Sequence, residues 1–218
     1  MKLTLHAYWR SSASYRVRIA LNLKGLDYGY VGHDLRKGAQ RDPAYLALNP
    51  LGLVPALEVE AQGARHVLTQ STAILEWLDD MVPGHALYPA DPFLRAEARA
   101  LVAMIAADVQ PLQNTRVLKS LREDYGASGP ASDDWARHWI TLGLDAAEVL
   151  LARRSGPYAM GDAPGAVDCL LVPQCYNAER FGLDLARWPR IAAVVGAARR
   201  HPAFVRSAPE MQPDADKA

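Results

Sequence analysis

Residues 49–57, Asn-Pro-Leu-Gly-Leu-Val-Pro-Ala-Leu, place a proline at the start of a predicted strand. Because proline has no N–H to donate to a sheet, a cis Val54-Pro55 bond is one explanation: it would turn the backbone of Val54 outward to receive an extended peptide. Gln70-Ser71, at the start of a predicted helix, offers amide, hydroxyl and backbone N–H groups for a carboxylate. Together these features predict a docking site for a small anionic peptide. An ordinary trans turn explains the proline equally well.

The sequence around this stretch predicts a small α/β domain over residues 1–82. Alternating apolar residues indicate strands, and a helix between the first two strands makes a parallel pair the expected arrangement. A polar start at Arg10-Ser11 and a stop at Gly25 bound that helix. The expected strands are residues 2–8, 28–33, 55–60 and 65–69, the last two forming a hairpin, and two further helices are expected at 42–48 and 71–81.

The second half of the chain predicts a helical domain. Residues 83–93 are rich in proline and turn signals, which is typical of a linker. Beyond the linker, residues 94–218 show helical periodicity and then a tail after Pro209 that we expect to be flexible. The expected helices are residues 94–124, 133–153, 166–181 and 189–200.

The composition excludes several classes of function. The chain has 218 residues, with 24 Lys plus Arg against 24 Asp plus Glu, so no net charge favours nucleic acid or a membrane surface. Neither a signal peptide nor an apolar run long enough to span a membrane is recognisable, so we expect a cytoplasmic protein. The two cysteines and six histidines lack the spacing of metal ligands, and no metal is expected.

Three motifs resemble those of the zeta-class glutathione transferases. Ser-Ser-Ala-Ser-Tyr-Arg-Val-Arg-Ile-Ala at residues 11–20 is similar to the signature of that class, and Gln-Pro-Leu-Gln-Asn at 110–114 is similar to its interdomain helix motif. Val-Pro-Gln at 172–174, with Glu-Arg-Phe at 179–181, adds a third match. The resemblance covers residues 1–210. It implies a thioredoxin-like α/β N-terminal domain, an all-α C-terminal domain and a homodimer.

Two departures from the class are visible. The cysteine of the signature is Ala13 here, so any role of that thiol is absent. The threonine that opens a helix-capping box is Gly165, although the acidic partner, Asp168, remains. Since glycine is tolerated at an N-cap, we expect that helix to persist with a weaker start.

The resemblance implies glutathione as the cofactor, held largely by the N-terminal domain. Ser11 matches the thiolate-stabilising serine of the class, and Ser12 is its neighbour and possible substitute. A hydroxyl donor and the positive end of a helix dipole both favour a thiolate; from position alone, both serines could equally cap the helix. The residues that the resemblance assigns to glutathione are Ser11, Ser12, Ala13, Ser14, Tyr15, Arg16, Gln40, Val54, Gln70, Ser71, Gln110, Asn114, Thr115 and Arg116.

The second substrate implied by the class is a small dicarboxylate with a cis double bond. Arginine suits a dianion because its planar fork binds carboxylates bidentately. Arg10, Arg116 and Arg180 are the candidates, with Arg10 and Arg180 matching positions shared within the class; each could instead be a surface salt-bridge partner. Arg16 and Arg18 are read mainly as structural residues that pair across the domain interface.

The class includes maleylacetoacetate and maleylpyruvate isomerases of aromatic compound catabolism. In their reaction the thiol adds to the double bond, rotation follows, and the thiol leaves unchanged, so no protein cysteine is needed. The resemblance therefore implies a cis–trans isomerase in which Ser11, Ser12, Arg10 and Arg180 are the catalytic candidates. Two alternatives remain: a transferase or dehalogenase acting on small α-halo acids, and a non-catalytic binding module.

Overall fold

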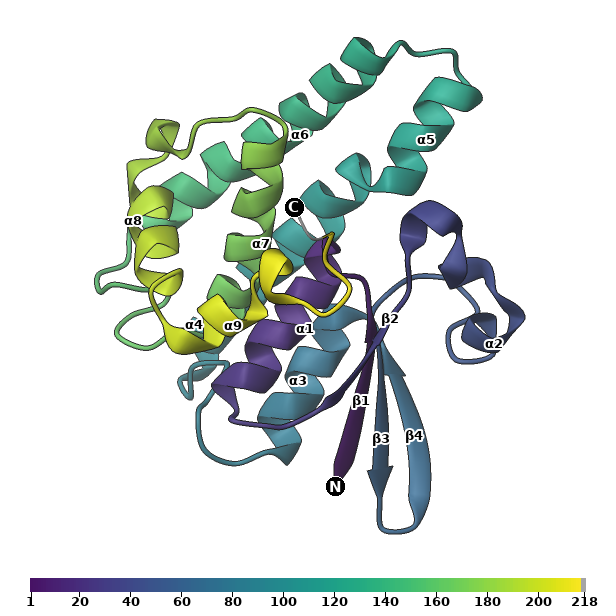
Figure 1. Cartoon of the computed structure of the whole chain (residues 1–218). Coiled ribbons are helices and arrows are strands. Elements are labelled where there is room, and N and C mark those ends of the chain that lie inside the picture. The colour runs from purple at the N-terminus through teal and green to yellow at the C-terminus, as the bar shows by residue number, and fades with distance from the viewer. Residues whose placement is uncertain (217–218) are drawn as a thin grey trace. The chain divides into compact units, whose positions relative to one another are not determined.

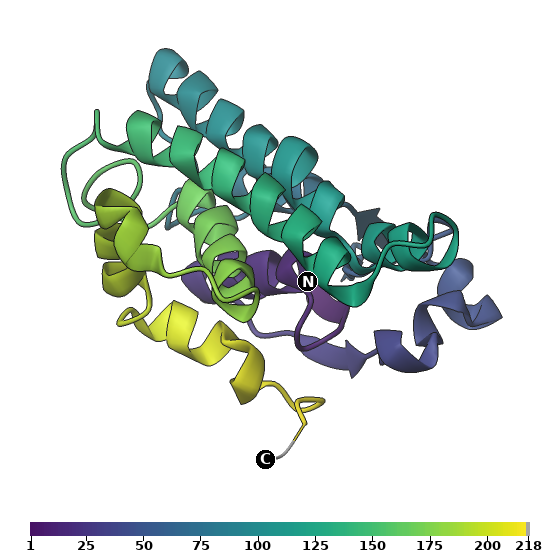
Figure 2. The ribbon, with the colours of Figure 1, turned by 90° about the horizontal axis from the view of Figure 1, so that it is seen from above.

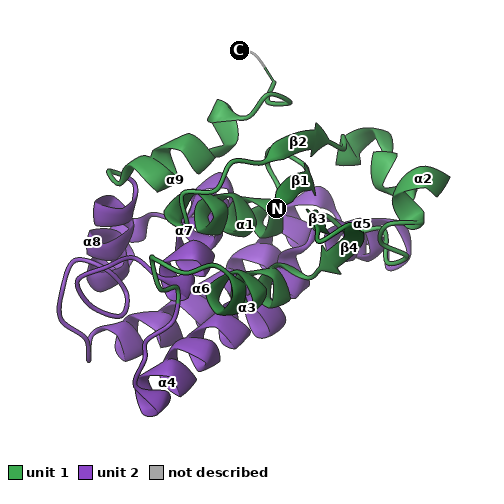
Figure 3. Cartoon of the chain, turned by 90° about the horizontal axis from the view of Figure 1, so that it is seen from below, with its two compact units in different colours: residues 1–87, 200–218 green, residues 88–199 purple. Residues whose placement is uncertain are grey.

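The computed structural model describes residues 1–216, which divide into two compact units (Figure 3). One unit contains Met1–Leu87 and the segment from Arg200 onward, and the other is Tyr88–Arg199. The break at Leu87 falls inside the predicted linker. The C-terminal segment joins the first unit, whereas the sequence assigns it to the helical domain. The physical reason is that helix α9 (Pro202–Ser207) packs against helix α1 (Ser12–Leu23).

The first unit is built on a four-stranded mixed sheet in the order β2-β1-β3-β4 (Figure 1). Strand β1 pairs in parallel with β2, and β3 pairs antiparallel with β4, as the sequence predicts. The structure adds an antiparallel pairing of β1 with β3. Leu5 lies in register with Leu57, and both are fully buried. The strands are β1 (Lys2–Ala7), β2 (Gly29–Gly32), β3 (Ala56–Ala61) and β4 (Ala64–Thr69).

Helices α1 and α3 (Ser71–Met81) pack against each other, and α2 (Pro43–Leu46) is a single short turn. Ser11 caps the start of α1, and Gly25 follows its end with φ of 66°, in the left-handed region that glycine tolerates best. Both predicted ends of α3 are confirmed. The result is the thioredoxin-like α/β arrangement that the sequence implies.

The second unit is entirely helical. Helix α7 contacts α4 and α8, and α6 contacts α8. Figure 2 shows α6 as the long helix of this unit. Helix α7 is buried along most of its length, including Cys169 and Cys175, which are free thiols. The helices are α4 (Pro92–Ala103), α5 (Thr115–Glu123), α6 (Gly129–Leu151), α7 (Ala166–Arg180) and α8 (Pro189–Ala198).

The prediction of one helix over residues 94–124 is wrong. Helix α4 ends at Ala103, a π-helical turn follows at Met104–Val109, and a 3₁₀ turn occupies Gln110–Gln113. Pro111 cannot donate an N–H to the preceding turn, so an α-helix is disfavoured there. The side chain of Asn114 then accepts the N–H of Arg116 and starts α5 afresh.

This break packs against α6 at Gly143. A Cβ atom added to Gly143 would lie 2.2 Å from a γ-methyl of Val109, which is buried and stiff at χ1. We therefore expect Gly143→Ala to lower the free energy of unfolding by about 1–3 kcal/mol, despite the better helix propensity of alanine. Chemical denaturation measures this difference.

Gly129, at the start of the same helix, is the matched control. A Cβ there would meet no atom within 4 Å. We expect Gly129→Ala to be neutral or slightly stabilising, and equal effects of the two substitutions would contradict the packing argument.

The start of α7, which the sequence predicts to be weak, is held by the side chain of Asp168. One carboxylate oxygen of Asp168 accepts the N–H of Gly165 and the other accepts the N–H of Ala159, both at 2.9 Å. The acidic half of the capping box is therefore present, and the expectation that the helix persists is confirmed.

The tail after Pro209 is ordered as far as Asp216, contrary to the expected flexibility. Pro209–Met211 form a 3₁₀ turn, and the side chains of Asp214 and Asp216 bond to Trp9 and Arg36 near the start of the chain. The composition of this stretch is polar and turn-rich, which is why it reads as flexible; the tertiary partners of its two aspartates are not visible in the sequence. No helix within residues 1–216 is long and apolar enough to cross a membrane.

Candidate functional site

Ser11 lies at the N-terminus of α1, at the end of the loop that follows β1. Its Oγ accepts the N–H of Ser14 at 3.2 Å, so the hydroxyl caps the helix. Accepting this bond uses a lone pair and leaves the hydroxyl hydrogen as a donor. Capping and thiolate stabilisation are therefore compatible. Ser12 is the first residue of α1 and, like Ala13, is half-buried.

Two predicted contacts further along α1 are buried. Ser14 is fully buried and its Oγ accepts the N–H of Tyr8 at 3.4 Å, and Tyr15 is only 4% exposed. These side chains lie in the core of the unit, so their assignment to glutathione stays a prediction.

Arg10 lies directly before Ser11 and is half-buried. Its guanidinium lies 5.4 Å from the ring centroid of Trp9, a cation–π contact that keeps the side chain beside the loop. The positive charge of Arg10 partly offsets the effect of burial, which raises the pKa of the Tyr8 hydroxyl.

Arg18 holds the same loop from the core. Its guanidinium donates to the carbonyl oxygens of Trp9 at 2.9 Å, Tyr8 at 3.5 Å and Ser207 at 3.0 Å. All three acceptors belong to the first unit, and they satisfy a fully buried cation. The structural role expected of Arg18 is confirmed, with its partners inside this unit rather than across an interface between units.

The Val54-Pro55 peptide bond is cis, as proposed from residues 49–57. Val54 is buried in a small apolar cluster with Tyr8, Trp9 and Tyr45. The segment before it is held by the Leu53 carbonyl, which accepts from the hydroxyl of Tyr45 at 2.6 Å. The loop between β1 and α1 and the segment that ends at Val54 therefore pack together in this cluster.

Gln40 approaches the same loop through its backbone. A Cβ on Gly52, which has φ of 60°, would lie 3.0 Å from the Gln40 carbonyl oxygen. The Gln40 side-chain oxygen is buried and has no hydrogen-bond partner within the part of the chain that the structure describes.

Gln70 and Ser71 begin α3, and a buried cation faces them. Arg16 donates from Nη1 to the hydroxyl of Ser71 at 3.2 Å and is only 2% exposed. Within residues 1–216, its Nε and Nη2 have no partner, and burial lowers the pKa of its guanidinium to about 10. Gln70 has φ of 66°, an uncommon conformation for a residue other than glycine.

A buried cation with unused donors is costly unless an anion joins it. The start of α3 also presents backbone N–H groups, which favour negative charge. Arg16, Gln70 and Ser71 therefore suit the carboxylate of a ligand such as glutathione, and the assignment of Arg16 to glutathione stays a prediction.

The second unit contains the remaining glutathione candidates. Gln110 starts the 3₁₀ turn and Asn114 caps α5, while Thr115 and Arg116, in the first turn of α5, are exposed. These residues and those around Ser11 belong to different compact units.

Arg180, in the last turn of α7, is oriented by a buried amide network. Its Nη1 donates to the Asn177 side-chain oxygen at 3.1 Å, and Asn177 donates in turn to Gln113. Gln113 donates to Gln174 at 2.8 Å, and the three amides are at most 8% exposed. Sequence reasoning missed the amides; the spacing of Asn177 and Arg180, three residues apart in a helix, was the available signal.

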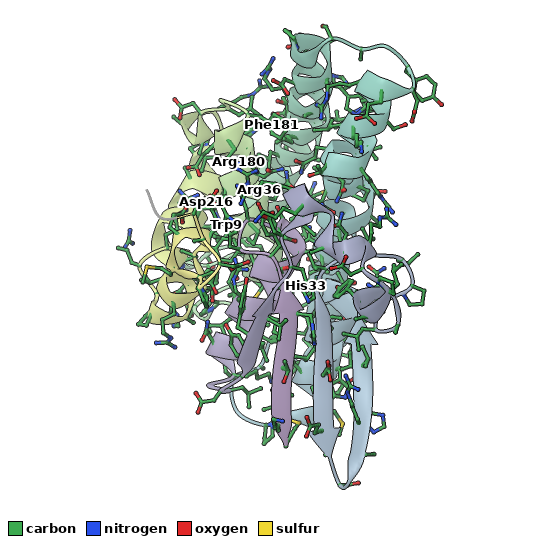
Figure 4. The ribbon with its side chains drawn as sticks, turned by 45° about the vertical axis from the view of Figure 1, so that its right-hand side comes forward. Trp9, His33, Arg36, Arg180, Phe181 and Asp216 are labelled. Carbon is green, nitrogen blue, oxygen red and sulfur yellow. The ribbon has the colours of Figure 1, made fainter. Side chains whose placement is uncertain are left out.

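A second missed cluster lies on the sheet. His6 Nδ1 and His33 Nε2 are 2.9 Å apart, and His6 Nε2 lies 2.6 Å from a Glu58 carboxylate oxygen. Burial lowers the pKa of His33, which is labelled in Figure 4. The sequence shows only scattered histidines, since strand pairing brings them together. Among residues 1–216 there is no group of three or more His, Cys, Asp or Glu side chains that could hold a metal ion.

Comparison with known proteins identifies the family. A sequence model described as "Glutathione S-transferase, N-terminal domain" matches residues 10–81. A Ralstonia protein named maleylpyruvate isomerase is 46% identical over 214 residues, covering 97% of this chain and 99% of its own. A Pseudomonas aeruginosa protein named maleylacetoacetate isomerase is 46% identical over 218 residues, covering 99% and 100%.

Solved structures point to the same family. Maleylacetoacetate isomerase from Anaeromyxobacter dehalogenans, with dicarboxyethyl glutathione and citrate bound in its active site, is 44% identical with a TM-score of 0.89, covering 98% of this chain and 94% of that one. Similarity of sequence and fold therefore extends over both units. The chain belongs to the zeta-class glutathione transferase family of maleylacetoacetate and maleylpyruvate isomerases.

Proposed function

We propose that this chain is a glutathione-dependent cis–trans isomerase that converts a maleyl dicarboxylate to its fumaryl isomer in aromatic compound catabolism. The observation that carries the glutathione part is the buried Arg16 cation, whose unused donors lie beside Ser71. The isomerase part is supported by full-length similarity to enzymes of that name.

In this proposal the first unit binds glutathione. Arg16, Gln70 and Ser71 hold the γ-glutamyl carboxylate, and the main chain of Val54 pairs with the cysteinyl unit. Ser11 donates its hydroxyl to the sulfur, and the N-terminus of α1 adds a favourable dipole worth roughly 0.3–1 kcal/mol. Gln40 reaches toward the glycyl end, where its unpaired side-chain oxygen accepts the glycyl N–H of glutathione.

Bound glutathione supplies the thiolate that adds reversibly to the double bond, so that rotation becomes possible. Arg10 and Arg180 bind the carboxylates of the substrate and stabilise the negative charge that develops on it. Arg116, exposed at the start of α5, tunes the choice of substrate. The buried amides behind Arg180 keep its guanidinium in one orientation before substrate arrives.

The activity test uses purified protein and maleylpyruvate, with the enol absorbance followed with and without glutathione. We expect substrate loss that requires glutathione and leaves its concentration unchanged. Maleylacetoacetate is assayed in parallel, since relatives of equal identity bear each name. Stoichiometric consumption of glutathione with an α-halo acid, and no isomerisation, would instead identify a conjugating transferase or dehalogenase. Failure to bind glutathione would favour a non-catalytic module.

Replacing Arg180 tests the substrate clamp. We expect Arg180→Gln to lower kcat/KM about tenfold, mainly through KM for the dicarboxylate, because one charge-assisted hydrogen bond is lost at an exposed position. Affinity for glutathione should not change. Arg187→Gln, which removes a surface partner of Asp145 in the same unit, is the control and should leave KM unaltered. Equal KM values for both variants would exclude Arg180 from the clamp.

We also propose that two copies pair and that the protein works in the cytoplasm. Phe93 at the start of α4 is 80% exposed, an apolar side chain that a contact between copies would cover. The chain has only two cysteines, both buried on α7, so it lacks the disulfide framework common in small secreted domains. Light scattering of the purified protein measures the mass of the assembly and so tests the pairing.

A further inference from the structure

The peptide groups on both sides of Trp9 are held by two side chains, one from α1 and one from the C-terminal tail. The Trp9 N–H donates to Asp214 Oδ2 at 3.0 Å, and the Trp9 carbonyl accepts from Arg18 at 2.9 Å. Arg18 comes from the core of the unit, whereas Asp214 comes from the C-terminal tail. One residue later the chain reaches Arg10, and then Ser11, whose N–H donates to the Tyr8 carbonyl at 3.0 Å. The backbone that carries both site residues is therefore clamped at Trp9.

Asp214 is itself fixed by a second bond. Its Oδ1 accepts the hydroxyl of Tyr30 at 2.7 Å, and burial together with this bond raises the pKa of Tyr30, so the hydroxyl stays a donor. The approach is close, because a Cβ on Gly32 would lie 2.9 Å from the Asp214 Cβ. Strand β2 thus holds the carboxylate against the Trp9 peptide.

The residues around Asp214 tie the tail to the same place. The Gln212 amide donates to the carbonyls of Arg206 and Ala208, at 3.0 and 2.8 Å. Ala215 packs on the apolar cluster that contains Trp9 and Val54. Asp216 forms two bonds to Arg36, at 2.7 and 2.9 Å, and Figure 4 shows Asp216 and Arg36 close to Trp9.

We propose that Asp214 is a positioning residue for the Trp9–Ser11 loop, and so for the thiolate donor Ser11 and the substrate arginine Arg10. This inference rests on the proposed function. In this role Asp214 acts by accepting the Trp9 N–H, not by binding glutathione or substrate itself. A displacement of about 1 Å in such a loop is enough to reduce turnover strongly.

The neighbouring Asp216 does not share this role. Its carboxylate is 55% exposed and its partner Arg36 48% exposed, which describes a surface ion pair of small energetic effect. Asp216 therefore provides a matched control: it has the same charge and lies two residues away, and within residues 1–216 its carboxylate bonds to Arg36 rather than to Trp9.

The experiment compares full-length wild type with Asp214→Ala, Asp214→Asn and Asp216→Ala. The first readout is hydrogen–deuterium exchange of the peptide covering Tyr8 to Ser14. The second is the pKa of glutathione bound to the protein, followed by thiolate absorbance near 240 nm. The third is kcat/KM in the isomerase assay, and melting temperature is recorded for each variant.

We expect Asp214→Ala to exchange faster over this peptide, to raise the bound thiol pKa and to lower kcat/KM about tenfold. Asparagine retains an oxygen that accepts the Trp9 N–H. Asp214→Asn should therefore stay closer to wild type than Asp214→Ala in exchange rate, thiol pKa and kcat/KM. Asp216→Ala should match wild type in all three readouts.

Unchanged exchange and unchanged thiol pKa in Asp214→Ala would overturn the inference, as would equal losses in Asp216→Ala. The exchange measurement needs neither glutathione nor substrate. If wild type binds glutathione but does not isomerise, the exchange and thiol pKa still decide the role of Asp214. Absence of both binding and turnover in wild type would instead reject the proposed function, with exchange alone deciding whether Asp214 holds the loop.

Discussion

Replacing Ser11 by alanine is expected to lower kcat/KM about 100-fold and to raise the pKa of bound glutathione by about one to two units. A hydroxyl hydrogen bond to a thiolate is worth roughly 1.5–3 kcal/mol, and its loss penalises the ionised form of the sulfur. Steady-state kinetics and the thiolate absorbance of bound glutathione measure both effects. Ser11→Thr keeps the hydroxyl and should retain most of the activity.

Loss of the helix cap must be separated from loss of the donor. Ser11→Ala also removes the bond to the Ser14 N–H, which costs about 1 kcal/mol of stability. Ser128 caps α6 in the same way, accepting the Ala131 N–H at 3.3 Å. Ser128→Ala should therefore destabilise similarly and leave the kinetics unchanged. Similar activities for the two alanine variants, assayed well below their melting temperatures, would show that Ser11 is only a cap.

Replacing Arg16 by methionine is expected to weaken glutathione binding on the order of 100-fold or more without destabilising the unliganded protein. Burial lowers the pKa of this guanidinium to about 10, which corresponds to a cost of about 3 kcal/mol for burying the cation. An apolar side chain of similar length avoids that cost. With glutathione bound, the carboxylate loses its buried partner, so affinity falls. Calorimetry and thermal denaturation, each with and without glutathione, measure the two effects.

Arg18, two residues along the same helix, gives the opposite expectation. Its donors satisfy the carbonyls of Tyr8, Trp9 and Ser207, which Arg18→Met would leave unpaired. We expect that variant to lose several kcal/mol of unfolding free energy, since each buried unsatisfied group costs about 1–3 kcal/mol. If Arg16→Met were equally unstable, or bound glutathione normally, Arg16 would be structural.

Local signals account for the parts of the fold that the sequence predicts well. Alternating apolar residues locate the strands, and the start and stop signals bound α1 and α3, because strand and helix periodicity depend on near neighbours. The prediction failed where local signals conflict. Residues 94–124 have a continuous helical pattern of apolar residues, and this pattern favoured one helix even though Pro111 lies within it. The structure resolves this conflict through the packing of Val109 on Gly143.

The candidate site divides in the same way. The motif around Ser11 and the Gln70-Ser71 pair are contiguous, so the sequence identifies them and their class of chemistry. The partners that hold them are distant: Asp214 lies 205 residues from Trp9, and Arg16 meets Ser71 across 55 residues. No periodicity or spacing reports such pairs.

Sequence alone reveals the family-like motifs, the α/β unit followed by helices, and the residue types that suit a thiolate and a dianion. The three-dimensional structure was needed to show that Arg16 is a buried cation with unused donors, that amides orient Arg180, and that the tail bonds to the loop before α1. Burial and hydrogen-bond satisfaction depend on which distant groups meet. Those meetings follow from packing of the whole unit, whereas helix and strand formation follow from near neighbours.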